Sequence, residues 1–161
     1  FFHSSLAPVY NIGGVWPPKE ILTIGASGIP LTNTIFLLSS GATVTWAHHA
    51  IRGKAKKHTI IGLFFTIILA VLFTLLQGYE YLNASFNIND SIFGSCFYMT
   101  TGFHGLHVTG GLIAFLIVLI RVFKAQKFGH SQATTAIVVS YYWHFVDIVW
   151  IALFTAIYLI K

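Results

Sequence analysis

An acid, an imidazole and two indoles fall on one side of a predicted helix near the end of the chain. Asp147 follows His144 by three residues, and Trp143 and Trp150 lie four residues before it and three after it. All four lie in an almost unbroken apolar run, from about 133 to 160, that is long enough to cross a bilayer. A charge at the centre of such a helix costs roughly 2.5–3.5 kcal/mol, so an intramembrane acid is a candidate functional residue. We expect this face to meet protein, with Asp147 as a fixed hydrogen-bond partner or as a proton carrier.

A second pair of imidazoles lies in the preceding apolar run, where His104 and His107 are three residues apart on one helix face. Neighbouring glycines, including Gly102 and Gly105, would let another helix or a rigid ligand approach closely. The structural interpretation is that each imidazole hydrogen-bonds a neighbouring helix, because an unsatisfied ring nitrogen is costly in hydrocarbon. The alternative is a haem or metal site, since His107 and His144 lie at a similar predicted depth that a bis-histidine haem could bridge.

Two further polar residues interrupt the most apolar run near its far end. They are Gln77 and Glu80, three residues apart, and Glu80 is expected to reach the interface. We predict that the intramembrane polar side chains form a buried network. Its members are Gln77, Glu80, His104, His107, His144 and Asp147.

The opposite interface carries Trp46, His48 and His49 at the end of the first apolar run. A histidine pair can ligate copper, but the exposed position and the lack of a nearby carboxylate favour an interfacial cap. Arg121 lies where another run meets the same interface, which is the expected place for a guanidinium to hold a lipid phosphate. Simple snorkelling of the side chain is the alternative. Cys96 is the only cysteine, so no Cys-pair metal centre can form, and we predict no metal site.

The composition is that of a membrane protein. Of the 161 residues, 56% are hydrophobic and only 8% are charged, against about 25% in soluble domains. The net charge of +5 does not indicate nucleic-acid binding, because the basic residues lie in short loops between apolar runs. No motif for nucleophilic catalysis, phosphate binding or dinucleotide binding occurs, so we predict no catalytic residue.

Four predicted transmembrane helices position these residues, after an ordered extramembrane loop over residues 1–29. The helices cover residues 30–51, 58–82, 93–122 and 131–160 of a single membrane domain. The predicted fold class is therefore an all-α, polytopic membrane helix bundle. Seven of the nine Lys and Arg residues lie at or just after the ends of the first and third helices, which places those loops on the cytoplasmic or matrix side and the C-terminus opposite.

Seven blocks of sequence are informative as a set. Any one of them alone is weak evidence for a family, but all seven in this order are very specific. They are FHSSLAP (2–8), GGVWPP (13–18), PLTNT with LSSG (30–41), VTWAHH (44–49), FTLLQ with EY (73–81), TGFHGLHV (101–108) and YWHFVDIVW (142–150). In this order they resemble cytochrome c oxidase subunit III over essentially the whole chain.

The resemblance implies the last four helices of a seven-helix subunit that carries no redox metal itself. Haem a and copper would lie in partner subunits, and this chain would flank catalytic subunit I, hold phospholipids and support proton uptake. Arg121 aligns with a basic residue of the family that contacts a phospholipid, and Trp46, His48 and His49 complete the predicted lipid-binding set. The implied location is the mitochondrial inner membrane, with the C-terminus on the intermembrane-space side, rather than a bacterial plasma membrane.

The resemblance leaves out the family's first two helices and most of its third. We expect them on a separate N-terminal polypeptide that packs against residues 1–8, unless the chain is a fragment. Two other identities stay open from the residues: subunit III of a quinol oxidase, and a small b-type cytochrome that uses His107 and His144.

Overall fold

Four α-helices form an antiparallel bundle in the part of the chain that the computed structural model describes, residues 28–125 and 130–159. This confirms the predicted all-α class. The helices are α2 (Ile29–Arg52), α3 (Lys56–Asn83), α4 (Ile92–Lys124) and α5 (His130–Phe154), which continues as a π-helical turn, η2 (Thr155–Leu159). The predicted loop over residues 1–29, with its proposed contact at residues 1–8, falls almost entirely outside the described residues.

Local sequence sets where the helices begin. Pro30 occupies the first turn of α2, where its missing N–H is not needed for an intrahelical bond. Ser91 caps α4, because its hydroxyl accepts a hydrogen bond of 2.9 Å from the Gly94 N–H. The connection between α2 and α3 is short and includes Lys54 at a φ of 54°. Such a short connection makes α2 and α3 antiparallel neighbours.

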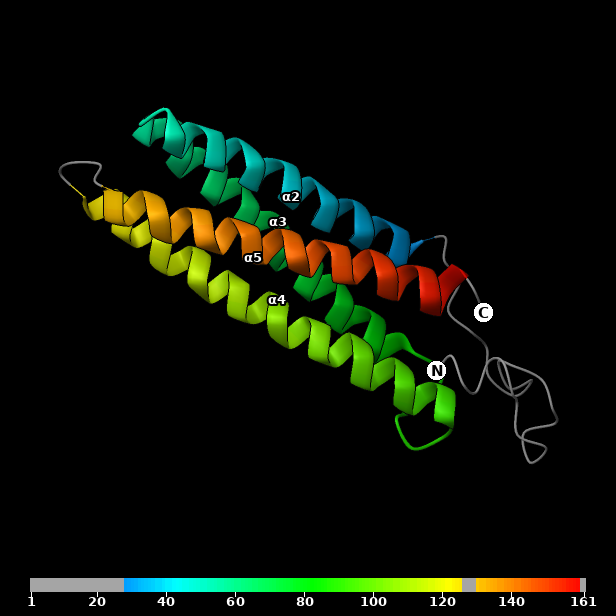
Figure 1. Cartoon of the computed structure of the whole chain (residues 1–161). Coiled ribbons are helices and arrows are strands. Elements are labelled where there is room, and N and C mark those ends of the chain that lie inside the picture. The colour runs from blue at the N-terminus through cyan, green and yellow to red at the C-terminus, as the bar shows by residue number, and fades with distance from the viewer. Residues whose placement is uncertain (1–27, 126–129, 160–161) are drawn as a thin grey trace.

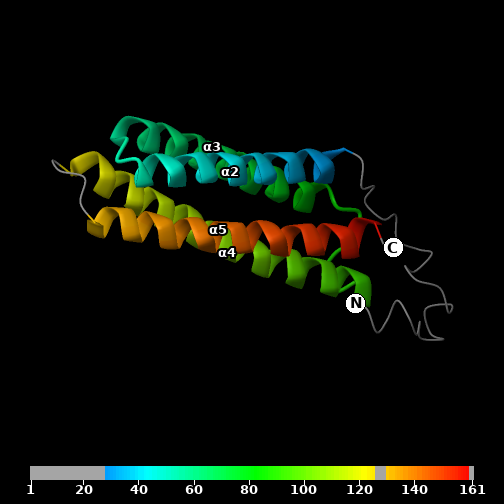
Figure 2. The ribbon, with the colours of Figure 1, turned by 45° about the horizontal axis from the view of Figure 1, so that its top comes forward.

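The helices occupy the four corners of the bundle. α2 packs against α3 and α5, and α4 packs against the same two helices, so α2 and α4 lie at opposite corners. The start of α2 and the end of α5 meet at one end of the bundle (Figure 1). Figure 2 shows α2 and α5 side by side along their lengths. The polar face predicted on α5 therefore has α2 as a neighbour.

Small residues bring α2 and α3 close together. A Cβ added at Gly62 of α3 would lie only 2.9 Å from the Ala47 Cβ of α2. Nearby, the hydroxyl oxygens of Thr43 and Thr66 are 2.8 Å apart and share a hydrogen bond. Glycine, alanine and threonine are the residues that allow such close contact between helices in lipid.

Three of the described helical segments are long and apolar enough to cross a membrane: Lys56–Asn83, Ile92–Lys124 and Ala133–Leu159. The fourth predicted span, α2, does not meet the hydropathy criterion, although its 24 residues would rise about 36 Å, more than a hydrocarbon core of about 30 Å. The reason is that α2 contains several polar residues, which lower its mean hydropathy. Two of them, Asn33 and Ser40, are fully buried inside the bundle. Hydropathy counts such residues as polar even where the other helices enclose them.

Candidate functional site

The predicted polar face of α5 lies against hydroxyl groups of α2. The Trp143 indole N–H donates to the Ser40 Oγ at 2.9 Å, and the Trp150 N–H donates to the Thr34 Oγ1 at 3.0 Å. Both indoles are fully buried. Each hydroxyl in turn donates to a backbone carbonyl of α2, at 2.6 Å for Ser40 and 2.8 Å for Thr34. We call this contact the α2–α5 seam. It consists of Thr34, Ser40, Gly41 and Thr45 on α2 and Trp143, His144, Asp147 and Trp150 on α5.

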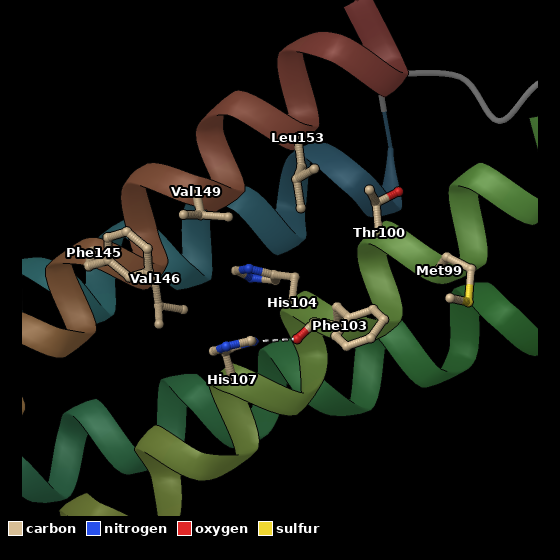
Figure 3. Close-up of a pocket in the computed structure, with 9 residues that line it drawn as sticks. All are labelled: Met99, Thr100, Phe103, His104, His107, Phe145, Val146, Val149 and Leu153. Atoms are coloured by element: carbon tan, nitrogen blue, oxygen red, sulfur yellow. Dashed lines mark hydrogen bonds between the residues drawn. The ribbon is translucent and has the colours of Figure 1, made fainter. Parts of the chain in front are cut away.

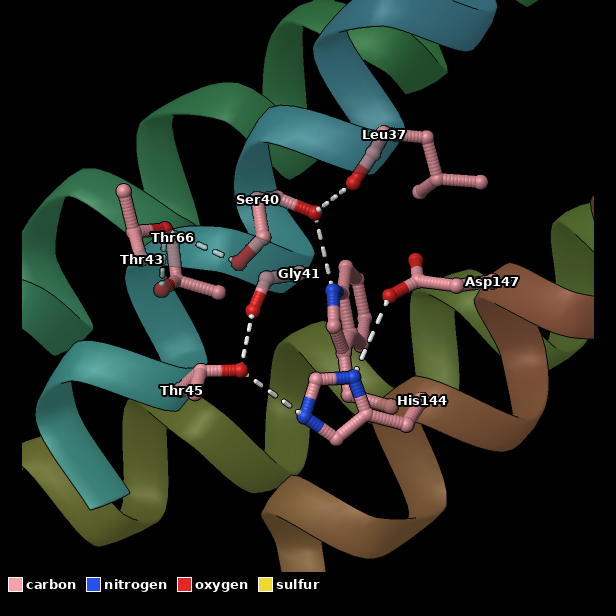
Figure 4. A network of polar contacts seen from close by, with 9 residues as sticks. Leu37, Ser40, Gly41, Thr43, Thr45, Thr66, His144 and Asp147 are labelled. Atoms are coloured by element: carbon pink, nitrogen blue, oxygen red, sulfur yellow. Dashed lines mark hydrogen bonds and ion pairs between the residues drawn. The ribbon is translucent and has the colours of Figure 1, made fainter. Parts of the chain in front are cut away.

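Asp147 and His144 are the two ionisable residues of the seam (Figure 4). The Asp147 Oδ2 lies 3.6 Å from the His144 Nδ1, and the His144 Nε2 lies 3.2 Å from the Thr45 Oγ1. The Thr45 hydroxyl donates to the Gly41 carbonyl at 2.9 Å, so it accepts the proton of the His144 Nε2. The imidazole therefore lies between Asp147 and the Thr45 hydroxyl of α2, and of these two contacts only the one with Thr45 is at hydrogen-bond distance.

Gly41 is the residue that lets the acid approach α2. A Cβ at this position would lie 2.5 Å from the Asp147 Oδ2, which real structures essentially never show. The other carboxyl oxygen of Asp147, Oδ1, is buried without a hydrogen-bond partner among the described residues. Asp147 is 6% exposed, so it is enclosed by protein within the single chain.

The second acid, Glu80, lies in a separate polar cluster at the end of the bundle where α2 begins. The Tyr158 hydroxyl donates to the Glu80 Oε1 at 2.6 Å, and the Asn33 side-chain amide donates to the Gln77 Oε1 at 3.1 Å. Glu80 is only 3% exposed, so the expectation that it reaches the interface is wrong. The expectation failed because Tyr158, in the π-helical turn, covers the carboxyl group and donates to its Oε1 inside the bundle. The Oε2 is buried without a hydrogen-bond partner among the described residues.

The two histidines of α4 have different surroundings. His104 is 4% exposed, with ring centroids 4.9 Å from Trp150 and 5.8 Å from Phe73, and its Nε2 has no hydrogen-bond partner among the described residues. His107 lies on the outer side of α4, where its Nδ1 is 2.7 Å from the Phe103 carbonyl oxygen. The predicted buried network is therefore divided among three places. His144 and Asp147 lie at the α2–α5 seam, Gln77 and Glu80 lie in the cluster with Tyr158, and His104 and His107 lie on α4.

The alternative of a haem between His107 and His144 needs both imidazoles to face one ligand. His144 instead bonds α2, while His107 bonds its own helix α4, and these helices lie at opposite corners. In residues 28–125 and 130–159, no group of three or more His, Cys, Asp or Glu side chains is arranged to hold a metal ion.

The predicted lipid-binding residues lie at one end of the bundle but at two corners. Arg121 is exposed in the last turn of α4, whereas Trp46, His48 and His49 are on α2. Sequence reasoning missed Lys56, whose ammonium group donates to the Phe123 and Ala125 carbonyls at 3.2 and 2.6 Å and so caps the end of α4.

Sequence reasoning also missed the partners of the polar groups it identified. Neither the hydroxyl residues of α2 nor Tyr158 carries a sequence signal that assigns it a partner on another helix. The 3-and-4 spacing on α5 gives the face but not its partner, because a partner on another helix has no fixed sequence separation.

Comparison with known proteins gives this bundle a family. The family model for cytochrome c oxidase subunit III matches residues 1–161, the whole chain. The chain belongs to the cytochrome c oxidase subunit III family. This confirms the resemblance drawn from the seven sequence blocks.

Individual relatives agree with the family match. The chain is 50% identical to cytochrome c oxidase subunit 3 of Pylaiella littoralis over 98% of its own length and 58% of the relative's. It is 51% identical to the subunit 3 of Triticum aestivum, over 98% and 59% of the two chains, and 48% identical to that of Drosophila melanogaster, over 98% and 60%. The chain therefore spans about three fifths of the length of these members of the subunit III family.

Proposed function

We propose that this chain is a non-catalytic core subunit of cytochrome c oxidase, which supports electron transfer from cytochrome c to oxygen by packing beside the catalytic subunit. The observation that carries the proposal is how the buried polar groups are used. Trp143, Trp150 and Glu80 each hydrogen-bond a side chain of another part of the bundle. Groups engaged in this way hold helices together, which is the role of a scaffold.

The outer surface of the bundle fits a subunit that is surrounded by lipid and other helices. Large apolar side chains are exposed on every helix, including Leu75 at 65%, Leu106 at 68% and Ile148 at 65%. We propose that haem a and copper are held by partner subunits and that this chain contributes no ligand to them.

Co-purification tests this proposal. The affinity-tagged chain should purify with a complex that oxidises cytochrome c and shows haem a absorbance. Dissociated from that complex, the chain itself should contain neither iron nor copper by elemental analysis. Recovery of the chain without the other oxidase subunits, or a Soret band on the separated chain, would overturn the proposal.

We propose that phospholipid binds at the basic end of the bundle, around Arg121. Its side chain is exposed there, and a guanidinium can bind phosphate with two parallel hydrogen bonds. Trp46 and His49, also exposed, would contact lipid at the α2 corner.

The substitution Arg121→Ala should remove at least one tightly bound phospholipid per complex, measured by native mass spectrometry. Lys57→Ala is the matched control, because Lys57 is exposed at the same end but on α3. Equal lipid content in the wild type and both variants would exclude a phospholipid site at Arg121.

We further propose that all four helices span the mitochondrial inner membrane, including α2. The basic loops would then face the matrix and the C-terminus the intermembrane space. A protease-sensitive tag at the C-terminus should be cleaved once the outer membrane is opened, with the inner membrane intact. Cleavage only after the inner membrane is broken would contradict this orientation.

A further inference from the structure

Buried polar atoms without a partner lie in two different settings in this bundle. His104, whose Nε2 has no hydrogen-bond partner among the described residues, lines a cavity of about 360 Å³ between α4 and α5 (Figure 3). The rim of this cavity includes Phe103 and Phe145, which are 57% and 59% exposed. Another protein segment can therefore reach the cavity from outside and cover it.

The second setting is the polar cluster around Glu80, at the end of the bundle where α2 begins. Three of its side-chain atoms are buried without a hydrogen-bond partner among the described residues: the Asn33 Oδ1, the Gln77 Nε2 and the Glu80 Oε2. The three residues are only 0–5% exposed, so neither a lipid nor a helix of another polypeptide can touch these atoms. Whatever satisfies them must fit inside the bundle.

The three atoms belong to one compact group of side chains. The Asn33 amide donates to the Gln77 Oε1 at 3.1 Å, and the Tyr158 hydroxyl donates to the Glu80 Oε1 at 2.6 Å. Gln77 and Glu80 are three residues apart on α3, so these two hydrogen-bonded pairs are neighbours on one helix face. Each unpartnered atom shares its carbon with an atom that is already bonded within the cluster.

A ligand that satisfies these atoms must both donate and accept hydrogen bonds. The Gln77 Nε2 is a donor, whereas the Asn33 Oδ1 and an ionised Glu80 Oε2 are acceptors. A metal cation would satisfy only the oxygens, and an anion would satisfy only the nitrogen. A water molecule can accept one bond and donate two, which gives the three hydrogen bonds typical of buried water. If the Glu80 Oε2 is protonated, it donates to the water, and the count is still three.

The class of ligand is the same for either orientation of the two amides. If both amides turn over, the Asn33 Oδ1 accepts from the Gln77 Nε2 instead. The unpartnered atoms are then the Asn33 Nδ2 and the Gln77 Oε1, which are again one donor and one acceptor. Water satisfies both of them beside Glu80.

The surrounding structure has both the geometry and the room for such a site. Tyr158 reaches Glu80 from the π-helical turn η2, and such turns are rare and are often found at functional sites. Gln77 also lines a cavity of about 220 Å³ between α3 and α4, and a water molecule occupies only about 30 Å³ in the liquid. Glu80 lies three residues before the end of α3, about 4.5 Å along its axis, so the adjacent aqueous phase is close.

We propose that Asn33, Gln77 and Glu80 bind an ordered water molecule inside the bundle. The water joins α2 to α3 directly, and it joins both to η2 through the hydrogen bond between Glu80 and Tyr158. It thereby holds the end of α5 against the start of α2, at the end of the bundle where the two meet (Figure 1).

Electron cryo-microscopy of the purified complex that contains this chain tests the proposal. At a resolution that shows other buried waters, a density peak should lie within hydrogen-bond distance of the Asn33, Gln77 and Glu80 side chains. The absence of this peak, or a side chain of another polypeptide in its place, would overturn the proposal.

Two substitutions identify the binding groups. Asn33→Leu keeps the approximate size of the side chain but removes its polar atoms, so the density peak should be lost. Thr74→Val is the matched control, because Thr74 lines the cavity beside Gln77 but its hydroxyl already donates to the Ala70 carbonyl at 2.9 Å. The peak should persist in this control. A peak that persists in Asn33→Leu as well would contradict the proposal.

If the Asn33→Leu chain does not accumulate, X-ray radiolysis of the unmodified complex gives an independent test. Hydroxyl radicals form from bound water and label the side chains beside it, so Tyr158 should be labelled although it is only 3% exposed. Phe115, which is 0% exposed and outside the cluster, is the control. Labelling of Tyr158 no stronger than that of Phe115 would overturn the proposal. Failure of the chain to enter a complex would instead count against the scaffold proposal.

Discussion

The two sides of α5 pack by different means. Toward α2, the indoles of Trp143 and Trp150 bond hydroxyl groups, and Gly41 lets a carboxyl group approach the helix. Toward α4, apolar side chains and two histidines surround a cavity of about 360 Å³. Small hydroxyl residues opposite large aromatic ones let the helices pack closely with both indole N–H groups hydrogen-bonded.

The difference suggests a division of roles between the two sides. We expect the α2–α5 seam to carry stability and the α4–α5 side to tolerate changes of volume. Three substitutions test this difference between the two sides of α5, each with an exposed residue of the same type as control.

The largest effect is expected from Trp150→Ala. Trp150 is fully buried, bonds Thr34 and packs against Phe73 with ring centroids 4.9 Å apart. Truncation of a buried aromatic residue costs roughly 3–5 kcal/mol. The free energy of unfolding, measured by denaturation of the purified protein in detergent, should fall by that amount. Trp46→Ala, at a position 44% exposed, should change it by less than about 1 kcal/mol. Similar losses in both variants would contradict the importance of the seam.

A smaller loss is expected from Gly41→Ala. The new Cβ would lie 2.5 Å from the Asp147 Oδ2, so the carboxyl group or the helix must shift, and overpacking costs roughly 1–3 kcal/mol. Gly78→Ala is the control, because a Cβ there has nothing within 4 Å. The control should be neutral or slightly stabilising, since alanine favours helix. A stable Gly41→Ala protein would show that α2 and α5 need not approach closely.

The smallest effect, and a gain, is expected from Val149→Leu. Val149 lines the cavity, so an added methylene group finds space and should raise the free energy of unfolding by about 0.5–1 kcal/mol, as other cavity-filling changes do. Val138→Leu, at a position 61% exposed on the same helix, should leave it unchanged. A loss of stability in Val149→Leu would mean that the α4–α5 side is as tightly constrained as the seam.

The family and the fold class were predictable because each depends on local sequence. Apolar runs longer than about 20 residues predict helices that cross a membrane. The α2 segment shows the limit of that rule, because its hydropathy is lowered by residues such as Asn33 and Ser40, which the other helices enclose.

The face of α5 that carries Asp147, His144 and the two tryptophans was determined by the sequence alone, because 3.6 residues per turn place these residues together on any helix. What they meet was decided by the tertiary structure. Ser40 lies 103 residues from Trp143, and Glu80 lies 78 from Tyr158, separations that carry no periodic signal. The cavity between α4 and α5 belongs to the same class, since its volume depends on how two helices pack and not on the pattern of either one.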